Sequence, residues 1–249
     1  MSGFVVGLDL GQSQDYSALV IVEKREDVGY DPAQVRTVTE QVIAYTFQGF
    51  GRTVDRGRPE QHTRRVLVQP DGSYRDVPEQ DAVVLSYDVR HIQRWPLGTS
   101  YPAIVSDVNA LMARAPLVDR APLVIDGTGV GRAVVDLFRQ SASYALTPVL
   151  ITAGATVSSD DAGYRHVPKR DLVGTVQVLL QNKQLRIGPS LPEAQTLTTE
   201  LQTFQTKISV NTAHESFGAW REGQHDDLVL SLALALWQGE RPQITMEWF

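Results

Sequence analysis

Aspartates at three places in the chain could do chemistry together. Asp9 lies inside the apolar run at residues 5–10, where a buried charge is costly unless it is paired or binds a metal. Asp126 ends another short apolar run, and the pair Asp226 and Asp227 opens an apolar segment near the end of the sequence. Carboxylate oxygens suit Mg²⁺ or Mn²⁺, and two such ions about 3.5–4 Å apart can hydrolyse a phosphodiester. The pattern favours a two-metal nuclease site.

Each aspartate also has an ordinary structural interpretation. Asp9 could hydrogen-bond a neighbouring turn, Asp126 could cap the helix that follows it, and Asp226 or Asp227 could be a helix N-cap. Three separate caps would not explain an acid inside the first strand. A shared site therefore accounts for more of the pattern than three unrelated caps do.

Apolar periodicity predicts the elements that would position these acids. Strands come first as a hairpin with a tight turn at residues 11–15, and later strands alternate with helices. This order predicts an α/β fold with a mixed sheet and helices on both faces. The expected strands are residues 4–10, 17–23, 38–47, 83–93, 123–126, 147–152 and 207–211. The expected helices are residues 103–114, 134–138, 168–180, 194–204 and 226–237.

Residues 49–80 have a different composition, rich in Arg, Gly, Pro and Gln, with little apolar periodicity. We interpret them as an exposed insertion with one small hairpin at the Pro70-Asp71-Gly72 turn, inside a single domain that spans residues 1–249.

Composition limits the function classes. A chain of 249 residues with 42% hydrophobic and 21% charged residues is typical of a globular protein. The absence of cysteine excludes disulfides, zinc-thiolate sites and cysteine nucleophiles. No apolar run is long enough to cross a bilayer, and the start of the chain lacks a signal-peptide pattern, so we expect a cytoplasmic protein without membrane contact. The net charge of −6 argues against a strongly basic DNA-binding surface, although a carboxylate site itself lowers the net charge.

Three segments resemble the C-terminal nuclease domain of phage terminase large subunits, within the ribonuclease H and retroviral integrase superfamily. They are Gly7-Leu8-Asp9-Leu10-Gly11-Gln12-Ser13-Gln14-Asp15-Tyr16-Ser17-Ala18, Val167-Pro168-Lys169-Arg170-Asp171-Leu172 and Ala219-Trp220-Arg221-Glu222-Gly223-Gln224-His225-Asp226-Asp227-Leu228-Val229.

The resemblance implies a ribonuclease H-like fold and a metal-dependent endonuclease that cuts double-stranded DNA during genome packaging in a bacterial host cell. It also implies that two divalent ions, Mg²⁺ or Mn²⁺, are bound by Asp9, Asp126, Asp226 and Asp227. A packaging ATPase, a portal and a small terminase subunit are the implied protein partners. The sequence has no Gly-x-x-x-x-Gly-Lys-Ser/Thr loop, so we expect a nuclease without the ATPase motor, either encoded separately or no longer used for packaging.

Four further residues are candidates for DNA contact or for an auxiliary role. Lys169 and Arg170 begin an expected helix and could hold a DNA phosphate, or could simply be a solvated helix start. His225 could assist a water or touch a phosphate, or could be an ordinary surface residue. Asp15 belongs to the first segment of the resemblance.

Other functions fit parts of the same pattern. Holliday-junction resolvases share the fold and the acids. The sugar-kinase, actin and chaperone-ATPase group shares the core fold and a similar first turn, but those proteins need two such domains. A third alternative is a module that binds DNA without cutting it. The glycine turn at residues 127–131 lacks the Gly-x-Gly-x-x-Gly spacing of a dinucleotide site.

Overall fold

The computed structural model of the chain describes residues 3–11, 15–28, 34–48, 53–77, 83–128, 132–211 and 226–241. Its contacts divide the chain into two compact units. The large unit consists of Met1–Arg25 and Leu85–Phe249, and the small unit is Glu26–Val84. The expected insertion at residues 49–80 lies within the small unit, which begins earlier in the chain and ends slightly later.

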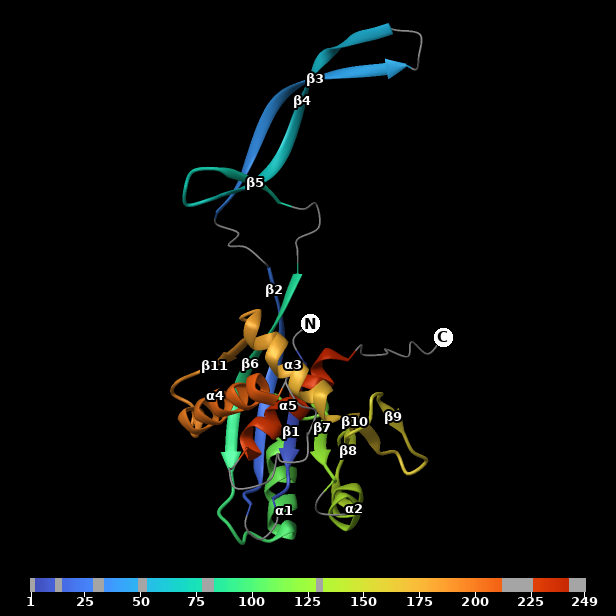
Figure 1. Cartoon of the computed structure of the whole chain (residues 1–249), viewed down its shortest axis with the longest axis vertical. Coiled ribbons are helices and arrows are strands. Elements are labelled where there is room, and N and C mark those ends of the chain that lie inside the picture. Colours follow the sequence, from blue (N-terminus) through green and yellow to red (C-terminus); the bar gives the residue numbers. More distant parts are fainter. Residues whose placement is uncertain are drawn as a thin grey trace. The chain divides into compact units, whose positions relative to one another are not determined.

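An eight-stranded sheet forms the centre of the large unit, in the order β11-β6-β2-β1-β7-β8-β10-β9 (Figure 1). β1 pairs antiparallel with β2 as the predicted hairpin, whereas β1 with β7, β7 with β8, and β8 with β10 are parallel. The strands are β1 (Gly3–Asp9), β2 (Ala18–Val28), β6 (Val83–Arg94), β7 (Leu123–Asp126), β8 (Leu146–Thr152), β9 (Ser158–Ser159), β10 (Arg165–Pro168) and β11 (Leu185–Ile187).

Helices cover both faces of this sheet because its central strands are apolar on both sides. In β1, Val5 packs into the core beneath one set of helices, while Val6 and Leu8 pack into the core on the opposite face. The first set is α3 (Lys169–Gln181), α4 (Ala194–Asn211) and α5 (Asp227–Glu240), and the second is α1 (Tyr101–Met112) and α2 (Arg132–Ser141). The mixed sheet and its two helical layers confirm the predicted α/β architecture, a mixed sheet with helices on both faces.

Some predicted elements differ from the structure. Residues 207–211, predicted as a strand, continue helix α4, because the helix that starts at Ala194 overrides a weak local β pattern. The strand predicted at residues 38–47 exists, but it belongs to the sheet of the small unit. Strands β9, β10 and β11 were not among the predicted elements, because runs of only two to four residues carry little periodicity.

The small unit is a three-stranded sheet of β3 (Val35–Gln48), β4 (Thr53–Val68) and β5 (Tyr74–Asp76). β3 and β4 form a long antiparallel hairpin with one irregularity in register. The predicted small hairpin is also present between β4 and β5. Its turn is fixed by Asp71, which accepts hydrogen bonds from the amide and hydroxyl of Ser73, and by Gly72 at a φ of 81°.

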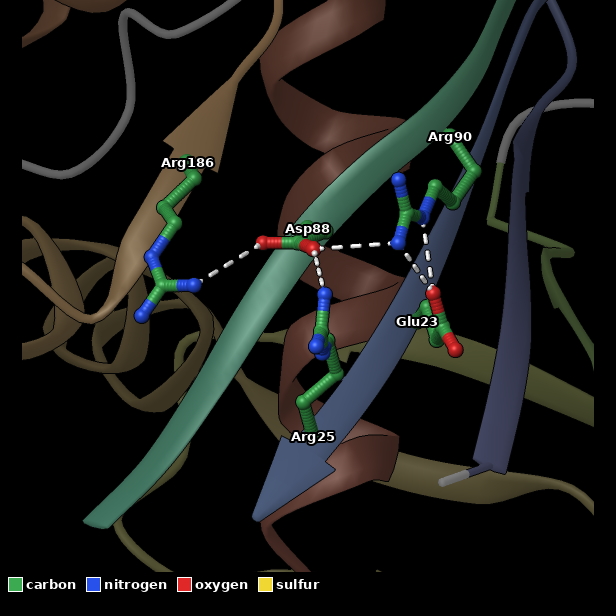
Figure 2. Close-up of polar contacts among 5 residues, drawn as sticks. All are labelled: Glu23, Arg25, Asp88, Arg90 and Arg186. Carbon is green, nitrogen blue, oxygen red and sulfur yellow. Dashed lines mark hydrogen bonds and ion pairs between the residues drawn. The ribbon is translucent and has the colours of Figure 1, made fainter. Parts of the chain in front are cut away.

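Charged side chains tie together three strands on the sheet face opposite α3 to α5 (Figure 2). The Asp88 carboxylate on β6 lies 3.2 Å from Arg25 of β2, 3.1 Å from Arg90 and 3.7 Å from Arg186 of β11. Arg90 also pairs with Glu23 at 2.6 Å. The arginines are about half-exposed, so each ion pair contributes little to stability on its own. Together the pairs link strands β2, β6 and β11.

None of the helices that the structure describes is long and apolar enough to cross a membrane.

Helix α5 lies unusually close to β1 because of a glycine in the strand. A Cβ atom at Gly7 would overlap the carbonyl oxygen of Ser231 and lie 2.9 Å from the Ala235 amide nitrogen. Both atoms belong to the helix backbone, which cannot rotate away as a side chain could. The sequence at this position therefore determines how closely the helix approaches the strand.

Gly7→Ala should lower the free energy of unfolding by about 3 kcal/mol, because the new methyl group pushes α5 away from the sheet. Gly174→Ala in α3 is the matched control, since a Cβ there meets no atom within 4 Å. The control should gain roughly 0.5–1 kcal/mol from better helix propensity. Urea unfolding of both variants checks this, and a Gly7→Ala protein as stable as wild type would contradict the close approach.

Candidate active site

Asp9 and Asp126 lie side by side at the carboxyl ends of neighbouring parallel strands. Leu8 of β1 is in register with Ile125 of β7, so the two aspartates follow at matching positions. Both are buried, with 6% and 2% of their surface exposed. Alternation along the strands turns both side chains toward the face covered by α3 to α5. The structure therefore brings these two predicted site residues together.

Ser231 fixes the start of helix α5 over the end of β1. Its hydroxyl oxygen accepts a hydrogen bond from the Asp9 amide at 3.2 Å. The same hydroxyl lies 2.8 Å from the backbone oxygens of Ala18 and Asp227, to either of which it can donate. Because Asp227 is one helical turn before Ser231, the buried Asp227 is held near the edge that carries Asp9.

Glu200 caps helix α5 from another helix. One carboxylate oxygen of this α4 residue accepts hydrogen bonds from the amides of Leu228 at 3.1 Å and Val229 at 3.2 Å. Asp226 occupies the N-cap position but makes no side-chain capping bond. The capping role considered for Asp226 and Asp227 is therefore filled by Glu200 instead.

Burial raises the pKa of the Glu200 carboxyl to about 7. The amide bonds from α5 and the positive charge of Arg94 lower it, and the negative charge of Asp227 raises it further. The other Glu200 oxygen is buried and has no hydrogen-bond partner among the residues that the structure describes. Such an environment favours the protonated, neutral form of the Glu200 carboxyl.

One Asp126 oxygen bonds the turn that follows β7 and not the first turn of helix α2, which begins at Arg132. Asp126 Oδ1 accepts a hydrogen bond from the Thr128 amide at 2.8 Å, which fixes the turn after β7. The Thr128 hydroxyl in turn accepts a bond from the Ile151 amide at 2.8 Å, linking this turn to β8. The contact orients the Asp126 carboxylate at the end of β7.

The auxiliary candidates are placed in different surroundings. Asp15 is exposed in the connection between β1 and β2. Lys169 and Arg170 begin α3, directly after β10. The Arg170 guanidinium donates to the Ala155 carbonyl and lies 3.5 Å from Asp171, so these local contacts occupy part of its donor capacity. His225 lies outside the described residues, as does the glycine turn beyond Thr128.

Glu200 and Ser231 were missed by the sequence analysis, although each carries a signal. Glu200 follows Leu197 by three residues and so lies on the apolar stripe of its helix, where an acid is unexpected. Ser231 is the polar exception inside the apolar residues 228–237. A buried polar residue on an apolar helix face usually has a hydrogen-bonding role, and both residues have one here.

A metal centre is not assembled in the described coordinates. Among residues 3–11, 15–28, 34–48, 53–77, 83–128, 132–211 and 226–241, no three or more His, Cys, Asp and Glu side chains are grouped closely enough to hold an ion. Asp9, Asp126 and Asp227 are buried and Asp226 is half-buried, but the described residues do not bring the predicted four-aspartate set together as a metal-binding cluster.

Comparisons with known proteins found solved structures of low similarity only. No protein-family model and no curated protein matched the sequence. Among solved structures, the large terminase nuclease of thermophilic phage G20c is 17% identical, with a TM-score of 0.45 over 94% of this chain and 81% of that one. The terminase nuclease domain of human cytomegalovirus, described as Mn soaked, is 11% identical, with a TM-score of 0.44 over 94% and 82%. At these TM-scores neither likeness assigns an activity to this chain.

Glu200→Gln should change how stability depends on pH. Because the native pKa of Glu200 is raised from 4.5 to about 7, its contribution is fully present below pH 4.5 and is lost as pH rises through about 7. Glutamine keeps an acceptor for the α5 amides and does not titrate. In EDTA, the melting temperature of Glu200→Gln relative to wild type should therefore rise across this pH range.

Glu200→Ala is the companion variant because it removes the cap itself. It should lower the free energy of unfolding by about 1–2 kcal/mol relative to Glu200→Gln at every pH. A constant difference between Glu200→Gln and wild type from pH 4.5 to above 7 would show that Glu200 does not titrate in this range.

Proposed function

We propose that the chain is a divalent-metal-dependent endonuclease that cleaves double-stranded DNA by two-metal-ion phosphodiester hydrolysis, as a terminase-type packaging nuclease does. The observation that carries the proposal is the pairing of Asp9 and Asp126 at matching ends of adjacent parallel strands, with Asp227 held nearby by Ser231. Buried carboxylates at the carboxyl edge of an α/β sheet occupy the place where active sites of such folds form.

The donor chemistry of the site fits the proposed ions. The candidate ligands Asp9, Asp126, Asp226 and Asp227 are all hard oxygen donors, which suit Mg²⁺ and Mn²⁺. Three of them are buried, so their mutual repulsion is weakly screened and a bound cation would relieve it. When bound, such ions supply an activated water and stabilise the leaving oxygen.

The protein's own residues supply rigidity and orientation. The strand ladder fixes Asp9 and Asp126 relative to each other, and the Thr128 amide orients Asp126. Ser231 and Glu200 hold the start of α5, and the Asp226 side chain makes no capping bond to its own helix. In the proposed site these neighbours keep the aspartates in position.

Duplex DNA with little sequence preference is the proposed substrate, because the sequence contains no motif that reads base edges. The acids alone would repel a phosphodiester. Binding should therefore depend on cations that neutralise this edge, in accord with a chain whose net charge is −6.

Purified protein should cut linear and plasmid duplex DNA with Mn²⁺ or Mg²⁺ and be inactive in excess EDTA. Asp9→Asn and Asp126→Asn should each lose most of this activity, about a hundredfold or more, because each removes a proposed ligand. Arg120→Gln is the control and should cut at the wild-type rate. Arg120 is exposed and lies just before β7, at the end of that strand opposite Asp126. Full cleavage in EDTA would exclude the metal mechanism, and preferential cleavage of four-way junctions would favour a resolvase.

Thermal melts should separate a metal site from a set of helix caps. Adding Mn²⁺ at a hundredfold above Kd should stabilise wild type by roughly 2.7 kcal/mol. Asp126→Asn keeps an oxygen that can accept the Thr128 amide bond, so the turn survives while one repelling charge disappears. The metal-free variant should melt at or above metal-free wild type and gain less from Mn²⁺. An equal Mn²⁺ response in both proteins would remove Asp126 from the ligand set.

A further inference from the structure

Arg94 lies at the same sheet edge as the aspartates. It is the last residue of β6, and the next amide, that of Trp95, donates to the Ser17 carbonyl at 3.0 Å. Ser17 directly precedes Ala18, which is the β2 partner of Asp9. Arg94 is therefore separated from the first aspartate by the width of one intervening strand.

Arg94 is also on the same face of the sheet as the aspartates. The side-chain alternation of β6 shifts between Val89 and Ile92, because both residues pack into the core beneath α3 to α5, and Arg94 follows Ile92 by two residues. The positive charge of Arg94 lowers the pKa of the Glu200 carboxyl on α4. Glu200 in turn accepts hydrogen bonds from amides in the first turn of α5. Arg94 therefore lies at the same end and on the same face of the sheet as the aspartates of β1, β7 and α5.

The Arg94 guanidinium is oriented but not neutralised by the residues that the structure describes. Its Cζ atom lies 3.9 Å from the centroid of the Tyr16 ring, a stacking contact that fixes the plane of the group. Its Nε is buried without a hydrogen-bond partner in the described part of the chain. No carboxylate among those residues pairs with Arg94, in contrast to Arg90 of the same strand.

A purely structural role as the counter-ion of Glu200 does not account for this arrangement. Among the described residues no ion pair joins Arg94 to Glu200, and the Glu200 carboxylate is bonded by the α5 amides instead. A partly buried guanidinium stays charged at any ordinary pH and gains most from an anion that accepts two parallel hydrogen bonds. A phosphodiester with two non-bridging oxygens is such an anion.

We propose that Arg94 is a phosphate-binding residue of the active-site edge, which holds non-bridging oxygens of the DNA backbone beside the aspartates. The inference rests on the proposed nuclease function for the identity of the ligand. Stacking on Tyr16 holds the Arg94 guanidinium plane in place before DNA binds, so the arginine side chain loses little conformational freedom on binding. Arg94 thus supplies local attraction for a polyanion at an edge that is otherwise acidic.

The test compares Arg94→Gln and Arg94→Lys with Arg120→Gln. Arg120 is exposed just before β7, at the end of that strand opposite Asp126, so its loss changes the net charge equally but leaves the site intact. Binding of a short fluorescent DNA duplex is followed by anisotropy over a series of salt concentrations, with Ca²⁺ present to occupy the acids. Thermal melts establish that each variant is folded.

Arg94→Gln should raise Kd about tenfold or more, because a hydrogen-bonded charge pair with the backbone is lost. The slope of log K against log salt should become shallower by about 0.9, the value for one phosphate contact. Arg94→Lys should bind with intermediate affinity, since it keeps the charge but not the paired donors. Arg120→Gln should match wild type in Kd and slope.

Wild-type affinity and slope in a folded Arg94→Gln protein would overturn the inference, as would equal losses in Arg94→Gln and Arg120→Gln. If Arg94→Gln does not fold, Arg94→Lys decides: a raised Kd at an unchanged melting temperature supports the assignment, and a wild-type Kd rejects it. A wild-type protein that binds duplex but never cuts it with Mn²⁺ would contradict the nuclease proposal while the binding comparison still tests Arg94.

Discussion

The close packing of α5 against β1 is the constraint on which the rest of the site depends. Because position 7 is glycine, the backbone of α5 at Ser231 lies directly on the strand, and the Ser231 hydroxyl reaches the Asp9 amide. That hydrogen bond joins residues 222 positions apart in sequence. Because Asp227 lies one helical turn before Ser231, the same contacts place the start of α5 over the end of β1.

The electrostatics of the edge follow from this packing. Asp9, Asp126 and Asp227 are each less than a tenth exposed, so water cannot screen them well. The same burial pushes Glu200 toward its protonated form, which lets it cap α5 without adding a full negative charge. The positive charge of Arg94, the last residue of β6, partly offsets the negative charge of these acids. In the proposed nuclease, bound cations would relieve the repulsion among these acids and so stabilise the fold.

Much of this arrangement could be predicted from sequence, because apolar runs and glycine turns are local signals. The β1–β2 hairpin, the strand ending at Asp126 and the helix opening at Asp227 follow from such runs. The helical state of residues 207–211 could not be predicted, since local β propensity and the continuing helix compete. The roles of Glu200 and Arg94 depend on contacts with residues far away in sequence, and no local pattern encodes such contacts.

Crystallography with Mn²⁺ and anomalous diffraction at the manganese edge would test the central claim most directly, because it locates ions without relying on activity. The account predicts anomalous peaks coordinated directly by Asp9 and Asp126, with Asp226 or Asp227 completing the ligand set. Peaks elsewhere on the protein, with the Asp9 and Asp126 carboxylates left uncoordinated at saturating Mn²⁺, would contradict it.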